Sequence, residues 1–244
     1  MGTLRASLFL LLVAGSASAA GLRLAAAANL NQVLPELVSV YEKLHPDVTV
    51  AVSYGASGTL SQQIERGAPY DVFLSASPEY VDYLARRGRV SARRVFARGR
   101  LVLYYSKRLN PPPRDLADLA AMKGVRVAVA NPEHAPYGRA ALSCLRSAGV
   151  YEELAGRLVF AANVSQAAQM ALHGADAALI ALPLARNPAL ERAGGYLELP
   201  QSCHQPLYQE AAVVRQSAAA GSFLDFLASP EAQRLLRAYG YDSP

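Results

Sequence analysis

Short apolar runs alternate with segments of helical periodicity along most of the chain. Leu22 to Ala28 is an apolar run of strand length, and between Leu30 and Leu44 apolar residues return every three or four positions, which is the period of an α-helix. The same order repeats from Val48 to Leu182. Because apolar strands that alternate with helices form mainly parallel sheets, the pattern predicts an α/β fold of that kind.

The alternation falls into two clusters, at about residues 22–88 and 100–182, followed by a tail with a strand and two helices. In open α/β sheets, ligands bind outside the carboxyl ends of the strands. Two such clusters are therefore naturally arranged as two lobes with a ligand cleft between them. Periodicity alone does not assign the tail to either lobe.

The first 19 residues have the pattern of a secretory signal. Arg5 provides a positive charge, Ala6 to Ala14 is a short apolar stretch, and Ala17-Ser18-Ala19 is a small-residue cleavage site. A membrane span needs about 20 apolar residues, and no cysteine directly follows the apolar stretch to carry a lipid. We expect residues 1–19 to be a signal peptide that directs export to the periplasm, so that the mature chain begins at Ala20.

The charge balance is moderately basic, with a formal net charge of +5. Arginines cluster between Ala85 and Arg100. Such a cluster can attract nucleic acid or another anion, but this segment lacks the repeated aromatic side chains on which unpaired bases stack. We interpret it as a solvated surface and expect no nucleic-acid partner.

The two cysteines, Cys144 and Cys203, lie 59 positions apart. Their spacing matches neither a metal site nor a C-x-x-C redox motif. Export would permit a disulfide, but the sequence cannot place their Cβ atoms. We expect two half-buried apolar thiols, with a disulfide as the alternative.

Ser57 lies in the stretch Gly55-Ala56-Ser57-Gly58-Thr59, between a predicted strand and a predicted helix. A nucleophile elbow has the pattern G-x-S-x-G at such a junction, but position 59 is Thr. A secreted serine hydrolase that uses Ser57 and His204 is therefore the weaker alternative. No dinucleotide-binding or P-loop motif is present, and no group of residues has the spacing of metal ligands.

Four strand-to-helix junctions end in small or neutral residues. The N-terminus of a helix has unpaired N–H groups and the positive end of the helix dipole, so it favours anions. For any single junction, ordinary N-capping by Asn29, Ser57 or Ser165 is the simpler interpretation. Taken together, the junctions favour a small tetrahedral oxyanion held by neutral donors. They are Ala28-Asn29, Ser57-Gly58-Thr59, Tyr137-Gly138 and Val164-Ser165.

Four segments resemble the molybdate-binding proteins that serve bacterial ABC transporters: "AAAANL", "GASGTLSQQIERGAPYDVFLSAS", "VAVANPEHAPYGRAAL" and "PQSCHQPLYQEAAVV". The likeness extends over nearly all of the mature chain. It implies a type II periplasmic-binding fold, in which two α/β lobes close on the ligand. Lobe 1 would comprise residues 20–101 and 207–244, and lobe 2 would comprise residues 102–206.

The same resemblance implies five oxyanion-binding residues. Ala28 would donate its backbone N–H, Asn29 its side-chain amide, and Ser57 both its hydroxyl and its N–H. Tyr137 and Val164 would donate backbone N–H groups from the other lobe. Asn at position 29 with Tyr at position 137 resembles one subgroup of the family. Another subgroup uses a tyrosine hydroxyl near position 181, which is Ala181 here, so we expect that contact to be missing.

The implied function is capture of molybdate or tungstate outside the cytoplasm and delivery to a membrane ABC permease. It involves no catalysis, no cofactor, and no metal except the molybdenum of the bound anion. We expect a monomer whose partners are a small inorganic oxyanion and the permease. The main alternative is the same fold binding sulfate or phosphate.

Overall fold

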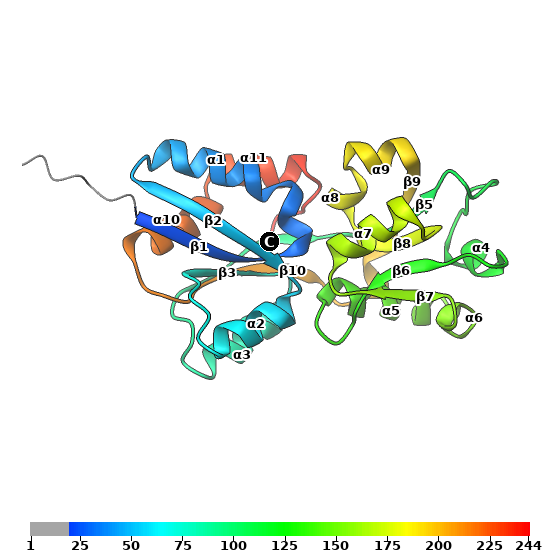
Figure 1. Cartoon of the computed structure of the whole chain (residues 1–244), viewed down its shortest axis with the longest axis horizontal. Helices are drawn as coiled ribbons and strands as arrows, with labels where there is room; N and C mark the ends of the chain where they lie inside the picture. The colour runs from blue at the N-terminus through cyan, green and yellow to red at the C-terminus, as the bar shows by residue number, and fades with distance from the viewer. Residues whose placement is uncertain (1–19) are drawn as a thin grey trace, which may run out of the picture.

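The computed structural model describes residues 20–244, and the predicted signal peptide lies outside the described residues. The chain folds into two five-stranded sheets, each with helices on both faces, set side by side along the long axis of the molecule (Figure 1). The predicted two-lobed α/β architecture is confirmed. Between residues 20 and 244, no helix is both long and apolar enough to cross a membrane.

The first sheet is built from the N-terminal strands and one strand that returns from the C-terminal part of the chain. Its strands are, in spatial order, β2 (Val48–Gly55), β1 (Ala20–Ala27), β3 (Val72–Ser75), β10 (Leu207–Val213) and β4 (Arg93–Gly99). β1 pairs in parallel with β2 and β3, whereas β10 pairs antiparallel with β3 and β4. The parallel prediction thus holds for the first three strands, and the whole sheet is mixed.

Alternating side chains of β1 enter two separate cores, as expected for a strand covered on both faces. Leu22 and Leu24 pack in one core, whereas Ala25 packs in the other. The first core is covered by α1 (Leu34–Leu44), α10 (Ala218–Leu227) and α11 (Pro230–Ala238). The second is covered by α2 (Ser57–Glu65) and α3 (Pro78–Ala85). The 3-10 helix η1 (Ala28–Gln32) follows β1 directly.

The second sheet has the same kind of order. Its strands are, in spatial order, β7 (Leu158–Ala161), β6 (Val127–Ala130), β8 (Ala177–Ala181), β5 (Leu101–Ser106) and β9 (Gly194–Glu198). Its helices are α4 (Leu116–Ala121), α5 (Pro136–Ser147), α6 (Tyr151–Ala155), α7 (Val164–His173), α8 (Leu182–Ala185) and α9 (Pro188–Ala193). β6 pairs in parallel with β7 and β8, whereas β5 pairs antiparallel with β8 and β9.

The chain crosses between the two sheets twice. The first crossing is the single step from Gly99, at the end of β4, to Leu101, at the start of β5. The second follows the 3-10 helix η2 (Gln201–Cys203) and enters β10 at Leu207. We use lobe 1 and lobe 2 for the residues packed around the first and second sheets. The structure places Leu101 in the second sheet, one residue before the predicted boundary.

Cys144 and Cys203 form a disulfide, with their Cα atoms 4.6 Å apart. The expectation of two free thiols was therefore wrong. The bond ties α5 to η2, and the Ser143 hydroxyl adds a 2.8 Å hydrogen bond to the Cys203 carbonyl. The neighbouring His204 is the third member of the one cluster of possible metal ligands among residues 20–244, but both sulfurs are used in the disulfide.

Candidate functional site

The predicted oxyanion-binding residues all line one small cavity between the lobes, with a volume of about 10 Å³. Each of them is at least 96% buried. The lining residues are Ala27, Ala28, Asn29, Gly55, Ala56, Ser57, Ala76, Ala135, Pro136, Tyr137, Asn163 and Val164. Ala181 is not among them, although it is fully buried at the end of β8. Segments far apart in the sequence thus meet at one point because each lies at the carboxyl end of a strand.

The predicted backbone donors lie at the N-termini of the helices around this cavity. Ser57 and Val164 are the first residues of α2 and α7, and Tyr137 is the second residue of α5. Ala28 and Asn29 begin η1. Within a helix, the N–H groups of the first turn have no acceptor. Both lobes therefore present donors to the same small space.

The electrostatic character of the cavity is positive without any cationic side chain. None of its lining residues is acidic or basic. No acidic residue lies in the first turn of η1, α2, α5 or α7, whereas α3, α6 and α11 each carry at least one there. A first-turn carboxylate would neutralise the positive end of the helix. Its absence at these four helices leaves the donors free to attract an anion.

Ser57 is held by lobe 1 in a way that leaves its hydroxyl hydrogen available. Its Oγ accepts a 3.0 Å hydrogen bond from the Ala76 N–H. The N-cap of α2 is Ala56, so the expectation that Ser57 caps this helix was wrong. Because the bond to Ala76 uses a lone pair of Oγ, the O–H group can still donate to a ligand.

The hydrolase alternative receives no support from these contacts. The hydrogen-bond partner of the Ser57 hydroxyl is a backbone N–H rather than a base. The His204 ring bonds through Nδ1 to the Gln205 carbonyl at 2.7 Å. A nucleophilic serine needs a base that accepts its proton.

The Asn29 side chain is also committed within lobe 1. Its Nδ2 lies 2.8 Å from Gln209 Oε1 and 3.0 Å from the Tyr241 hydroxyl. Both amide hydrogens are therefore used, and the predicted donation from this amide to the anion is not available in this arrangement. The Asn29 backbone N–H remains as its donor. Asn29 does not cap η1 either, because the N-cap is Ala27.

Ser165 is the third residue for which we expected capping. The N-cap of α7 is Asn163, whose side chain accepts a hydrogen bond from the Gln166 N–H. Ser165 Oγ instead accepts a 2.7 Å hydrogen bond from Asn31 Nδ2, which lies in lobe 1. The capping expectation is therefore corrected here as well, and Ser165 proves to be a contact between the lobes.

Tyr137 is almost fully buried where lobe 2 meets lobe 1. Within the described chain its hydroxyl has no hydrogen-bond partner, and burial raises the pKa of this phenol well above its usual value. The hydroxyl lies beside Gly99, since a Cβ built on Gly99 would be 2.0 Å from it. Tyr137 therefore stays neutral, with its N–H at the cavity and its ring against the first crossing.

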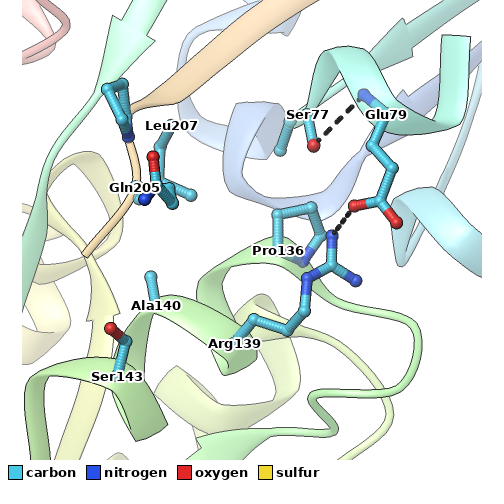
Figure 2. Close-up of a pocket in the computed structure, with 10 residues that line it drawn as sticks. Ser77, Glu79, Pro136, Arg139, Ala140, Ser143, Gln205 and Leu207 are labelled. Carbon is cyan, nitrogen blue, oxygen red and sulfur yellow. Dashed lines mark hydrogen bonds and ion pairs between the residues drawn. The ribbon is translucent and has the colours of Figure 1, made fainter. Parts of the chain in front are cut away.

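Several direct contacts hold the lobes together around the cavity. The Gly58 N–H donates to the His134 carbonyl at 2.8 Å, and Asn187 Nδ2 donates to Gln32 Oε1 at 2.9 Å. Arg139 of α5 forms a 2.8 Å ion pair with Glu79 of α3 (Figure 2). These contacts join the two lobes at three places.

A larger groove adjoins the cavity and shares Ala76 and Pro136 with it. Figure 2 shows the Arg139–Glu79 pair on one side of this groove, and Gln205 and Leu207 of the second crossing on another. No pattern in the sequence predicted this ion pair, which joins residues 60 positions apart. It places the cation of Arg139 next to an otherwise uncharged site and neutralises it with Glu79.

The polar residues that support the site were also not predicted. Gln209 lies within the quoted segment "PQSCHQPLYQEAAVV", but nothing in the periodicity assigns it a partner. Tyr241 had no sequence signal at all. Both are at least 98% buried, and both contact Asn29.

Comparisons with known proteins agree with this fold. The family described as bacterial extracellular solute-binding protein matches residues 22–242. The molybdate-binding protein ModA of Rhodobacter capsulatus is 35% identical over 254 aligned positions, covering 98% of this chain and 96% of that protein. ModA of Azotobacter vinelandii is 32% identical over 238 positions, covering 94% and 93%.

Two solved structures extend the comparison. The periplasmic molybdate-binding protein of Azotobacter vinelandii has a TM-score of 0.82 at 31% identity, covering 91% of this chain and 99% of that chain. A sulfate-binding protein of Mycobacterium tuberculosis has a TM-score of 0.79 at 19% identity, covering 92% and 87%. The second likeness shows the shared fold only.

Proposed function

The chain belongs to the bacterial extracellular solute-binding proteins, in the branch that contains the molybdate-binding proteins, and we propose that it captures molybdate in the cavity between its lobes. Its relatives in this branch are molybdate-binding proteins, and the chain is accordingly a binding protein rather than an enzyme. The observation that carries the proposal is the convergence of Ala28, Asn29, Ser57, Tyr137 and Val164 on one cavity without charged side chains.

The chemistry of the donors favours a fully deprotonated dianion. Molybdate at neutral pH offers only acceptor oxygens, which match the N–H groups and the Ser57 hydroxyl. A protonated phosphate also carries an O–H, which must find an acceptor or remain unpaired at a cost of roughly 1–3 kcal/mol. Among the lining residues described, two buried side-chain oxygens lack a partner, Asn29 Oδ1 and the Tyr137 hydroxyl. Phosphate binding would therefore identify one of these two atoms as facing the ligand.

Size separates molybdate from sulfate, because both are tetrahedral dianions that accept the same hydrogen bonds. Molybdate and tungstate are larger than sulfate and nearly equal to each other. We propose that the pocket prefers the two larger anions and accepts both. The same argument gives no reason for a preference between them.

The rest of the transport cycle follows from the same proposal. Residues 1–19 would direct export to the periplasm, and the mature protein would act as a monomer. Binding would stabilise the arrangement in which the lobes touch, which is a shift of population by differential affinity. An ABC permease in the membrane would receive the loaded form.

Isothermal titration of residues 20–244 with molybdate, tungstate, sulfate and phosphate tests the proposal. We expect one-to-one binding of molybdate and tungstate, with sulfate and phosphate weaker by at least about tenfold, which corresponds to roughly 1.4 kcal/mol. Preferential binding of sulfate or phosphate would retain the fold and replace the ligand. Calorimetry is the suitable method, because the chain contains no Trp to report binding by fluorescence.

A further inference from the structure

The Asn29 side chain is held by two residues that come from the opposite end of the chain. Gln209 lies on β10, 180 positions away, and Tyr241 follows α11, 212 positions away. All three side chains are at least 98% buried. Neither Gln209 nor Tyr241 lines the cavity, so each would act on the ligand indirectly, and Asn29 is the lining residue that both of them bind.

The hydrogen bonds of this cluster fix the orientation of each member. Gln209 Nε2 donates to the Leu207 carbonyl at 2.8 Å, which leaves Gln209 Oε1 to accept from Asn29. The Tyr241 hydroxyl donates to the Asn29 carbonyl at 2.8 Å, and its oxygen accepts from Asn29 Nδ2. A rotated Asn29 amide would place its oxygen against Gln209 Oε1, so the network permits one orientation.

The cluster holds the backbone of Asn29 as well as its side chain. The Tyr241 hydroxyl donates to the carbonyl of Asn29, which is the second residue of η1. Burial raises the pKa of Tyr241 above its usual value, so this hydroxyl stays protonated and keeps its donor. The position of the donors at residues 28 and 29 is thereby tied to the C-terminal segment of the chain.

The cluster also lies beside both crossings between the lobes. Leu207, whose carbonyl holds Gln209, is the first residue of β10 after the second crossing. At the first crossing, a Cβ on Gly99 would lie 3.1 Å from Gln209 Nε2 and 2.0 Å from the Tyr137 hydroxyl. Gln209 therefore connects Asn29 of lobe 1 with the place where Tyr137 of lobe 2 is seated.

We propose that Gln209 and Tyr241 are positioning residues for the oxyanion site, which hold Asn29 so that the N–H groups of residues 28 and 29 point into the cavity. The inference rests on the proposed function. It assigns to the C-terminal segment around residue 241 a part in ligand binding that neither the cavity lining nor the sequence motifs indicate.

A matched pair of tyrosine variants tests the role of Tyr241. Tyr41 is equally buried in lobe 1, and its hydroxyl also donates to a backbone carbonyl, that of Ala219, at 3.0 Å. Tyr241→Phe and Tyr41→Phe each remove one such hydrogen bond, and Tyr241→Phe also removes the acceptor of Asn29 Nδ2. We expect Tyr241→Phe to weaken molybdate binding by roughly five- to tenfold, since both buried hydrogen bonds from Tyr241 to Asn29 are lost, and Tyr41→Phe to leave the Kd within twofold. Equal effects of the two variants, or an unchanged Kd in Tyr241→Phe, would overturn the proposal.

A double-mutant cycle tests Gln209 in the same way. Gln209→Leu should weaken molybdate binding in the natural background and have no further effect in an Asn29→Ala background, because residues that act through one partner are not additive. Additive effects would mean that Gln209 acts elsewhere.

Amide hydrogen exchange of the ligand-free protein separates this inference from the ligand assignment. Tyr241→Phe should increase exchange in residues 27–33 and leave the second sheet unchanged, whichever anion the wild type binds. Unaltered protection of residues 27–33 would exclude positioning by Tyr241 even if molybdate binds. Increased exchange in a protein that binds no molybdate would retain the positioning role and reject the ligand.

Discussion

The two lobes hold their donors by different means. In lobe 1, hydrogen bonds of polar side chains do so: the Ser57 hydroxyl accepts from the backbone N–H of Ala76, and the side chains of Gln209 and Tyr241 bind Asn29. In lobe 2, backbone packing does so. Gly138, directly after Tyr137, lies so close to β6 that a Cβ there would be 2.1 Å from the Ala130 carbonyl oxygen.

This difference indicates which substitutions each lobe can tolerate without loss of ligand binding. A backbone N–H is retained in any substitution except that by proline. Ligand binding by lobe 2 should therefore be sensitive to substitutions where the backbone is tightly packed, and insensitive to the removal of polar atoms at the ends of its side chains. Lobe 1 depends on polar side chains that are buried, where the loss of one partner leaves the other unpaired. The predictions below test this contrast in order of decreasing effect.

The largest effect is expected from Asn29→Asp in lobe 1. The introduced carboxylate would lie against Gln209 Oε1 and beside the bound dianion, and an uncompensated buried charge costs roughly 3–5 kcal/mol. The loss depends on the charged form of the new carboxyl group, so it should diminish as the pH falls and the group becomes protonated. Molybdate titrations at two pH values measure it, and binding at neutral pH within fivefold of wild type would contradict the prediction.

The next effect is expected from Gly138→Ala in lobe 2. The overlap with Ala130 forces the start of α5 away from β6, at a cost of roughly 3 kcal/mol in the free energy of unfolding, and displaces the Tyr137 N–H. Gly156→Ala is the matched control, because a Cβ at Gly156 meets no atom within 4 Å and its φ is an ordinary −71°. Denaturant unfolding and molybdate titration of both variants should differ sharply, and similar values would contradict the packing argument.

A smaller effect is expected from Ser57→Ala. The variant removes a donor to the charged ligand and the acceptor of the Ala76 N–H, so molybdate binding should weaken by roughly 1–3 kcal/mol. Ser61→Ala is the control on the same helix, because Ser61 is equally buried and its hydroxyl donates to the Gly58 carbonyl at 2.8 Å. An equal loss of affinity in both variants would mean that Ser57 acts only through the stability of α2.

The smallest effect is expected from Tyr137→Phe. The backbone N–H remains and only a buried hydroxyl without a partner is removed, so the molybdate Kd should stay within about twofold, which is below 0.5 kcal/mol. The pKa of Tyr137 is raised in the folded state. The stability that depends on its neutral form is therefore present below about pH 10, the value in the unfolded chain, and is lost as the pH rises above it. Thermal unfolding at alkaline pH should decline less steeply for the Phe variant, and parallel profiles would contradict this assignment.

The alternation of apolar strands and helices was enough to predict the fold and to bring four junctions to one cleft. It worked because parallel strands deliver their carboxyl ends to the same edge of a sheet. Strand β4 was not predicted, since Arg93, Arg94 and Arg98 give it a charged pattern. Those arginines form ion pairs with Glu210, Asp225 and Asp242, which come from residues more than 100 positions later.

The site was predictable at the level of backbone positions but not of side-chain partners. Ser57 and Asn29 have the residue types of helix caps, but both side chains form hydrogen bonds with residues distant in the sequence instead. The Asn29 amide could not be assigned from the sequence, because Gln209 and Tyr241 reach it only after the C-terminal segment has folded onto lobe 1. The disulfide was unpredictable for the same reason, as its geometry depends on where η2 lies relative to α5.

The bond between Cys144 and Cys203 has a consequence for how the protein must be made. A chain produced in a reducing cytoplasm keeps both thiols, and the covalent connection between α5 and the segment that leads into β10 is then absent. α5 carries the Tyr137 N–H. Protein prepared in a reducing compartment would therefore differ from protein prepared in an oxidising one in how firmly this donor is held at the ligand site. The compartment of expression is thus a variable of any affinity measurement on this protein.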